Sequence, residues 1–307
     1  MNDIVIKTEQ LTKKYGKQTV VNKADIHVKK GRIYGLLGRN GAGKTTIMKM
    51  ILGLTPITSG SIKVFGKNIQ GNEKKMYPRI GAIIETPGFY PNLTGTENLE
   101  IFARLRGTAS PNAVKKALDI VGLPYKDKKT FAKYSLGMKQ RLGIANAILH
   151  DPELLILDEP TNGLDPIGIA EVRDFIKRLS VEHGKTILIS SHILSEISLL
   201  ADDIGIIDRG VLLEESPMSE LEKRNSRYIL LQVSNIPKAM LILERQFHVK
   251  NYSVQDEQTI RIYNTSLDMG AVNKALIMED ITVISSGICN DTLEDYFKRI
   301  TGGEGIA

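Results

Sequence analysis

The segment GRNGAGKT, residues 38–45, matches the phosphate-binding pattern G-x-x-x-x-G-K-[ST], and few folds present this pattern to a ligand. It stands between the apolar run IYGLL, which predicts a strand over Ile33–Gly38, and the run TTIMKMIL, which predicts a helix over Lys44–Leu54. Glycines in such a loop let backbone N–H groups surround a phosphate, and the following helix adds the positive end of its dipole. The segment therefore predicts an α/β fold that binds ATP or GTP.

The chemistry of phosphate gives roles to single residues of this segment. The Lys44 ammonium is expected to reach the β- and γ-phosphates and to assist catalysis, and the Thr45 hydroxyl is expected to ligate Mg²⁺. The remaining expected nucleotide contacts in the segment are Gly38, Asn40, Gly41, Gly43 and Thr46.

Two carboxylates follow a second apolar run in LLILDEP, residues 154–160. Asp158 is expected to hold Mg²⁺, directly or through water. Glu159 is then placed to polarise a water for in-line attack on the γ-phosphate, which is the role of a general base. An exposed Asp-Glu pair at a strand end is common, so this interpretation depends on the phosphate-binding segment upstream.

From Ile4 to about Glu215, short apolar strands alternate with helices, which is typical of a parallel sheet covered on both faces. The stretch from about Thr86 to His150 is mostly helical and predicts an inserted helical subdomain. Expected strands are Ile4–Tyr15, Thr19–Val28, Ile33–Gly38, Ser61–Phe65, Arg79–Glu85, Glu153–Asp158, Thr186–Ser190 and Ile204–Leu213. Expected helices are Lys44–Leu54, Thr96–Arg106, Pro111–Val121, Leu136–Leu149, Pro166–His183 and Ser191–Ala201.

The pattern changes near Ser216–Pro217, which predicts one domain over residues 1–215 and a second over 217–307. The second domain is expected to have the order β-α-β-β-α-β, which resembles a small ferredoxin-like α+β domain. No catalytic spacing occurs within it. Its expected strands are Arg227–Val233, Val249–Val254, Thr259–Tyr263 and Ile281–Ser285, and its expected helices are Pro237–Glu244, Met269–Met278 and the closing Thr292–Ile300.

Charge and composition argue against a nucleic-acid-binding, membrane-spanning or secreted protein. The net charge of +6 comes from Lys and Arg that are spread along the chain, so no nucleic-acid footprint is expected. No apolar run approaches the ~20 residues that span a bilayer, and the single Cys289 can form no internal disulfide. The N-terminus MNDIVIKTEQ lacks a secretory apolar region, so we expect a cytoplasmic protein.

The motifs and their order over residues 4–215 resemble the nucleotide-binding subunits of ABC transporters. The resemblance makes Gly38–Thr45 the Walker A loop and Asp158–Glu159 the end of Walker B. It implies that Tyr15, in KKYG, stacks on adenine and that Asp165, in NGLD, lies near a dimer interface. It also implies that His192, in ISSH, contacts the γ-phosphate during catalysis.

The segment YSLGMKQR, residues 134–141, stands where this family has its LSGGQ signature. The resemblance implies that this signature closes over ATP held by the Walker A loop of a second subunit. Ser135 would bond the γ-phosphate, Gly137 would let the backbone approach, and the helix N-terminus would face the anion. Leu136 and Met138 replace the usual glycine and glutamine. Ser135 is expected to act as a helix N-cap as well.

Glu85, in IIETPGFYPNLTGTENL, stands where the family usually has a glutamine that senses the permease. A glutamate can still ligate Mg²⁺, but it adds a negative charge near the γ-phosphate, which is expected to slow hydrolysis or tighten metal dependence. Together with the SLGMKQR signature, this glutamate resembles the subgroup that exports bacitracin and lantibiotic-type antimicrobial peptides.

The resulting hypothesis is an ATPase motor subunit that forms a homodimer around ATP and drives a separate membrane permease from the cytoplasmic face of the membrane. Permease helices are expected beside Glu85–Asn98. One alternative is a soluble ABC ATPase that acts on ribosomes or DNA, but such proteins typically carry two cassettes or long coiled coils. Another is a nucleotide switch with negligible turnover, against which the intact Glu159 and His192 argue.

Overall fold

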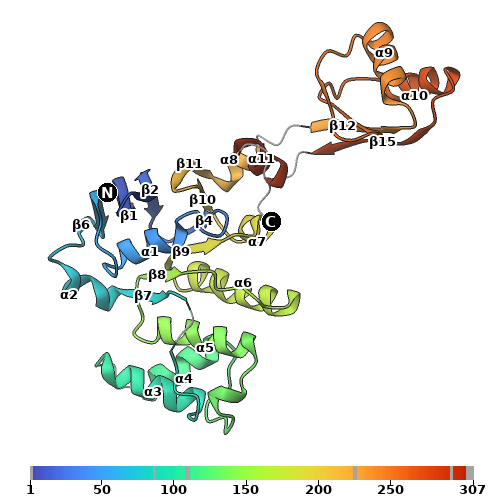
Figure 1. The fold of residues 1–307 in the computed structure, drawn as a ribbon. Helices are drawn as coiled ribbons and strands as arrows, with labels where there is room; N and C mark the ends of the chain where they lie inside the picture. Colours follow the sequence, from blue (N-terminus) through green and yellow to red (C-terminus); the bar gives the residue numbers. More distant parts are fainter. Residues whose placement is uncertain (1–2, 86–87, 108–110, 224–226, 291–292, 302–307) are drawn as a thin grey trace. The chain divides into compact units, whose positions relative to one another are not determined.

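The computed structural model describes residues 3–85, 88–107, 111–223, 227–290 and 293–301. These residues form two compact units, of which the first ends at Ser219 and the second begins at Glu220 (Figure 1). The sequence places this change of pattern a few residues earlier. The first unit extends further because β11 (Val211–Pro217) pairs with β10 (Asp203–Asp208) of its parallel sheet.

The first unit is built on a six-stranded sheet with the order β11-β10-β4-β9-β8-β7. All neighbouring pairs are parallel except the hairpin of β10 and β11. Every residue of β4, β8 and β9 is buried, which agrees with their unbroken apolar runs. The other four strands of this sheet are β4 (Ile33–Leu37), β7 (Ile80–Ile83), β8 (Leu154–Leu157) and β9 (Thr186–Ser191).

An antiparallel sheet and helix α1 (Lys44–Ile51) share one hydrophobic core with the parallel sheet. Ile6 of the antiparallel sheet, Ile47 of α1 and Leu36 of β4 are all fully buried in it. This packing fixes the start of α1, and with it the phosphate-binding segment, against the parallel sheet. The antiparallel strands are β1 (Ile4–Tyr15), β2 (Gln18–Ala24), β3 (His27–Lys29), β5 (Ser59–Val64) and β6 (Lys67–Asn68).

Two single strands expected from the sequence are each two strands in the structure. The expected strand Ile204–Leu213 is the β10–β11 hairpin, because Arg209 and Gly210 both adopt positive φ angles, 46° and 82°, and reverse the chain. The expected strand Thr19–Val28 breaks into β2 and β3, where the Thr8 hydroxyl donates to Ala24 O and accepts from Ile26 N.

The helix expected over Ser191–Ala201 is also shorter in the structure, because Ser191 belongs to β9. Helix α7 spans only Leu194–Ser198. The Ser191 hydroxyl accepts a hydrogen bond from Ile193 N at 2.9 Å, which orders the turn between strand and helix.

The segment between β7 and β8 is helical, as expected. Helix α3 begins with a capping box, in which the Thr94 hydroxyl accepts from Glu97 N and the Glu97 carboxylate accepts from Thr94 N. Phe89 lies against Phe102 and Phe131, with ring centroids 5.6 and 5.1 Å apart. This segment contains α3 (Gly95–Leu105), α4 (Pro111–Ile120), η2 (Phe131–Lys133) and α5 (Leu136–Ile148). The first unit also has α2 (Glu73–Met76), η1 (Tyr77–Arg79) and α6 (Pro166–Val181).

The second unit has the expected element order β-α-β-β-α-β around an antiparallel sheet with the order β13-β14-β12-β15. Residues of α9, α10 and the sheet, such as Leu243, Leu276 and Leu231, form its own core. Its elements are β12 (Arg227–Val233), α9 (Ile236–Phe247), β13 (Tyr252–Val254), β14 (Thr259–Ile262), α10 (Met269–Met278), β15 (Val283–Asn290) and α11 (Leu293–Ile300). Helix α8 (Met218–Lys223) spans the boundary between the units.

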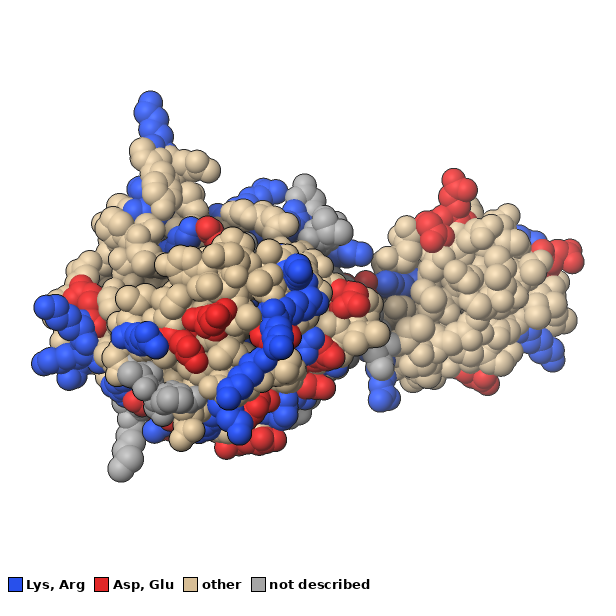
Figure 2. All heavy atoms as spheres, turned by 90° about the horizontal axis from the view of Figure 1, so that it is seen from below, with Lys and Arg blue, Asp and Glu red and all other residues tan. Residues whose placement is uncertain are grey.

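Two surface properties bear on partners. Figure 2 shows basic and acidic side chains interspersed on the face of the first unit that it presents. Within the described ranges, none of the helices is both long and apolar enough to cross a membrane.

Candidate functional site

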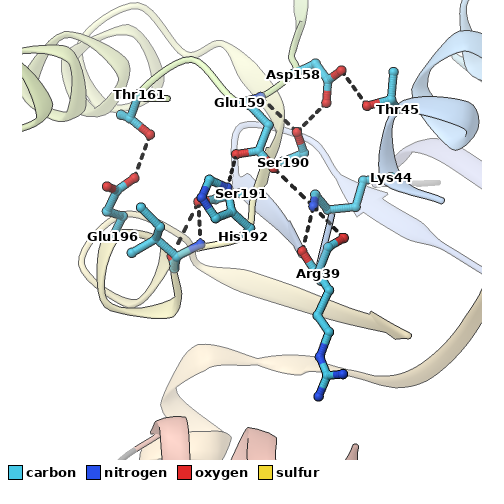
Figure 3. A network of polar contacts seen from close by, with 12 residues as sticks. Arg39, Lys44, Thr45, Asp158, Glu159, Thr161, Ser190, Ser191, His192 and Glu196 are labelled. Atoms are coloured by element: carbon cyan, nitrogen blue, oxygen red, sulfur yellow. Dashed lines mark hydrogen bonds and ion pairs between the residues drawn. The ribbon is translucent and has the colours of Figure 1, made fainter. Parts of the chain in front are cut away.

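The central part of the predicted site lies where three neighbouring strands end. Strands β4, β9 and β8 run parallel, so their carboxyl ends meet at one edge of the sheet. The phosphate-binding segment follows β4, Asp158 and Glu159 follow β8, and His192 follows β9. Figure 3 shows these side chains pointing toward one another.

The loop after β4 has the conformation that its glycines permit. Gly41 and Gly43 have φ angles of 82° and 109°, a region that side chains rarely adopt. A Cβ atom on Gly43 would also lie 2.9 Å from Val20 O, and one on Gly38 would lie 2.3 Å from Ile207 O. The tight packing therefore needs glycine at both positions. Asn40 is exposed at the outer side of the loop, and Thr46 is half-buried on α1.

The Lys44 side chain is buried and lies across this loop. Its Nζ donates to the carbonyl oxygens of Gly38 at 2.6 Å and Arg39 at 3.1 Å. The ammonium is therefore held at the centre of the loop, where a phosphate group would be surrounded by backbone N–H groups.

Both oxygens of the buried Asp158 carboxylate accept hydrogen bonds from hydroxyl groups. The Thr45 hydroxyl donates to Oδ2 at 2.7 Å, and the Ser190 hydroxyl donates to Oδ1 at 2.6 Å. Ser190 also accepts a hydrogen bond from Glu159 N at 2.9 Å, so it links the two acidic residues. Ser190 is not among the residues expected from the sequence to form the site, because its only signal is a hydroxyl at the end of the buried run TILIS.

The Glu159 carboxylate bridges a cation and an imidazole. Its Oε1 lies 3.1 Å from Lys44 Nζ, and its Oε2 lies 2.7 Å from His192 Nδ1. Glu159 has a φ angle of 47°, which is uncommon for a residue other than glycine. Such backbone conformations occur more often at functional sites than elsewhere. Two neighbouring loops therefore fix the direction of this carboxylate.

A further pair of side chains links the segments that follow β8 and β9. The Thr161 hydroxyl donates to Glu196 Oε2 at 2.5 Å (Figure 3). Glu196 lies on α7, in the segment that begins just after His192. This bond links the two loops that carry Glu159 and His192. No sequence pattern marks it, because its partners are 35 positions apart in the chain.

The oxygen donors present are of the kind that Mg²⁺ prefers, although they are few. Thr45 and Asp158 supply one hydroxyl and one carboxylate side by side. No group of three or more His, Cys, Asp or Glu side chains in the described part of the chain could hold a metal by itself. The arrangement suits a Mg²⁺ ion that takes its other ligands from phosphate oxygens and water.

Glu85 lies outside this network. It follows β7, its side chain is 67% exposed, and its Oε1 forms an ion pair with Lys49 Nζ at 2.6 Å. Tyr15 also lies outside the network, at the end of β1, where its exposed ring has Lys13 Nζ 4.6 Å from the centroid.

The signature segment forms the start of α5. Ser135 is the N-cap, with its hydroxyl accepting from Met138 N at 3.3 Å. Within the described residues, no hydrogen bond joins Ser135 to the Lys44 network. Leu136 lies over the loop of Asp165: a Cβ atom on Gly163 would be 3.1 Å from its Cδ2. Asp165 itself caps α6 by accepting from Gly168 N at 2.9 Å.

Comparison with known proteins agrees with this geometry. Residues 21–162 match the family model described as ABC transporter. The chain is 55% identical to "Bacitracin transport ATP-binding protein BcrA" from Enterococcus faecalis over 305 residues, which cover 99% of each chain. It is 47% identical to "Lantibiotic transport ATP-binding protein SrtF" from Streptococcus pyogenes over 211 residues, covering 69% of this chain and 90% of that protein.

Among solved structures, the chain resembles "Structure of ATP binding subunit of ABC transporter". The TM-score is 0.63 at 29% sequence identity, and the match covers 72% of this chain and 92% of the other.

Proposed function

Because this chain belongs to the family of ABC transporter ATP-binding proteins, we propose that it works as a dimer that couples ATP hydrolysis to a separate membrane permease. As a family member it binds and hydrolyses ATP, and it is the ATP-binding motor subunit of a transporter. The observation that supports the catalytic proposal most strongly is the Glu159 carboxylate, held between Lys44 and His192.

In the proposed reaction, Lys44 and the N–H groups of the loop after β4 bind the phosphates of ATP. Thr45 and Asp158 would hold Mg²⁺, which would supply positive charge to offset that of the phosphates. Lys44 turns from Glu159 to the phosphates, because they carry more negative charge than one carboxylate. Glu159 then accepts a proton from the attacking water, and His192 keeps its carboxylate directed at that water.

The position of Ser135 supports action on the ATP of a second subunit. Ser135 and Gly137 lie at the N-terminus of α5, where backbone N–H groups and the helix dipole favour an anion. In the described residues this helix start makes no hydrogen bond to its own Lys44 network. We therefore assign Ser135 and Gly137 to a facing subunit's γ-phosphate, with Asp165 at the interface and Tyr15 against adenine.

A cavity of about 700 Å³ in the first unit is the proposed contact site for the permease. It lies beside the end of α1, η1 and β7, not along the whole of Glu85–Asn98. Arg106 at its edge donates to Asn146 O at 2.6 Å and has no carboxylate partner among the described residues. An apolar permease helix that carries one carboxylate would fit this lining. The lining residues are Leu52, Leu54, Lys74, Tyr77, Pro78, Ile80, Ala82, Arg106 and His150.

The proposed substrate class is an antimicrobial peptide, exported from the cytoplasmic face of the membrane where the permease would hold this subunit. The relatives named for bacitracin and lantibiotic transport support this class, as does Glu85 in place of the usual glutamine. The match to the bacitracin relative extends through the second unit, whereas the match to the lantibiotic relative covers 69% of the chain. Bacitracin is therefore the first substrate to test. Action on ribosomes or DNA is disfavoured, because the relatives that match over the full length are named as transport proteins.

The test begins with a tagged chain, isolated from membranes of its native host with its bound partners. We expect a protein with several membrane spans, and we expect Arg106→Glu to reduce its recovery while Arg104→Glu, an exposed change on the same helix, does not. The recovered pair, expressed in a sensitive host, should raise the inhibitory concentration of bacitracin unless it carries Glu159→Gln. Recovery of ribosomes or DNA in place of a membrane protein would reject the transport proposal.

A further inference from the structure

Lys49 connects Glu85 to α1, the helix that begins in the phosphate-binding segment. It lies on α1 four residues after Thr45, and residues four apart share one face of a helix. Its Nζ forms the 2.6 Å ion pair with Glu85, and this hydrogen bond raises the pKa of Lys49. The negative charges of Glu85 and Asp158 also contribute to the rise.

Glu85 needs a partner that fixes its direction. Its φ angle is 61°, in the left-handed region that is uncommon for glutamate, and its side chain is mostly exposed. An unpaired carboxylate here would be free to approach the Thr45–Asp158 pair, where it could ligate Mg²⁺ or repel a phosphate. The ion pair instead directs it to Lys49, outside the network of Lys44, Asp158 and Glu159.

We propose that Lys49 is a positioning residue for Glu85: it holds the glutamate outside the nucleotide site and offsets its charge, and so limits the Mg²⁺ dependence of ATP binding. This inference rests on the proposed Mg²⁺–ATP site. It adds Lys49 to that site as the residue that allows a glutamate at position 85. A neutral glutamine at position 85 would not need the cation.

The consequence is a change in metal dependence. Without Lys49, the free Glu85 carboxylate repels nucleotide that has no metal, and it is available as an additional ligand when Mg²⁺ is present. Both effects increase the ratio of the dissociation constant without Mg²⁺ to that with Mg²⁺. Exposed ion pairs contribute little, so the expected increase attributable to the pair is about threefold.

The experiment measures this ratio by equilibrium titration with a non-hydrolysable ATP analogue, in EDTA and in excess Mg²⁺. Four full-length proteins form a cycle: wild type, Lys49→Met, Glu85→Gln and the double variant. Removing the Lys49 charge has a direct effect on phosphate binding, and this effect is the same whether residue 85 is glutamate or glutamine. It therefore cancels when the two changes in the ratio are compared, and the remaining difference measures the contribution of the Lys49–Glu85 pair. Lys49→Arg is the matched control that keeps the charge, and it should keep the wild-type ratio.

We expect Lys49→Met to raise the ratio about threefold more when residue 85 is glutamate than when it is glutamine. Equal changes in the two backgrounds would reject the role of Lys49 while leaving the ATP site in place. A wild-type protein that binds no analogue with Mg²⁺ would instead reject the proposed function on which the inference rests. Circular dichroism of each variant checks that α1 and the rest of the chain remain folded.

Discussion

The ammonium of Lys44 lies 3.1 Å from Oε1 of Glu159, so the residue proposed to bind phosphate is ion-paired with the residue proposed to activate water. Each of these side chains holds the other in the site. We expect an entering phosphate group to compete with Glu159 for the Lys44 ammonium, because both are anions. In the proposed reaction Glu159 then keeps its hydrogen bond to His192 and gains access to the attacking water.

This relationship predicts that Glu159→Gln binds ATP at least as tightly as the wild type. The amide no longer holds Lys44 by an ion pair and no longer repels the γ-phosphate. Turnover should fall at least about 100-fold, because the amide cannot accept the proton of the attacking water. Titration with ATP and a phosphate-release assay on the same preparation check both parts. Turnover within twofold of the wild type would remove Glu159 from the base role.

Lys44→Ala should act on binding itself. It removes the ammonium that lies across the phosphate-binding loop, and the loss of charge-assisted hydrogen bonds of this kind should lower the affinity about tenfold or more. The measurement is equilibrium titration with ATP in Mg²⁺, with Lys49→Arg as a control that alters a cation on the same helix without removing it. An unchanged affinity in Lys44→Ala would show that the phosphates lie elsewhere.

Ser190 and Ser191 are adjacent serines with different partners, which makes them a matched pair of variants. The Ser190 hydroxyl bonds Asp158 and Glu159 N, whereas the partner of the Ser191 hydroxyl among the described residues is the backbone of Ile193. Ser190→Ala leaves one oxygen of the buried Asp158 without a donor, so we expect a higher Mg²⁺ requirement and turnover about tenfold lower. Ser191→Ala should change both quantities much less. If the two variants changed the Mg²⁺ requirement and turnover equally, the hydrogen bond from Ser190 to Asp158 would not be the cause. Titration of ATPase activity with Mg²⁺ provides the comparison.

The lowered pKa of His150 leads us to expect that folding stability depends on pH. Burial lowers the pKa of its imidazole below 6.5, and the charge of Arg106 lowers it further. The folded protein therefore binds its proton less readily than the unfolded chain, so stability is greatest above pH 6.5 and is lost as the pH falls through the lowered pKa. Urea unfolding at pH 7.5 and 5.5 should show a smaller loss for His150→Gln than for the wild type. A loss of the same size in both proteins would contradict this assignment.

The sequence predicts those parts of the molecule in which local pattern and local chemistry coincide. The phosphate-binding segment, the carboxylates after β8 and His192 after β9 all follow apolar runs, and parallel strands bring their ends together. The hairpin at Arg209–Gly210 was missed because its apolar pattern continues through the turn. Links such as Ser190 to Asp158 and Lys49 to Glu85 join residues more than 30 positions apart. Such pairings depend on how the sheet and α1 pack, and single-sequence periodicity carries no information on that packing.

The proposed action of Ser135 on a second subunit can be tested with mixed dimers. One subunit carries Lys44→Ala and the other carries Ser135→Arg, and both carry Glu159→Gln so that bound ATP is not hydrolysed. If the signature acts across the interface, the intact Lys44 of the second subunit faces the intact Ser135 of the first. One site is then complete, and the other lacks both residues.

If Ser135 instead served the ATP of its own subunit, each site would lack one residue and neither would be complete. The mixed dimer should therefore retain one ATP through rapid gel filtration, while each parent homodimer retains little. Because arginine at position 135 could disturb the start of α5, the Ser135→Arg homodimer must first show the wild-type helical signal by circular dichroism. A folded mixed dimer that retains no more ATP than its parents would place Ser135 outside the facing site, because complementation is possible only when the two residues of one site come from different chains.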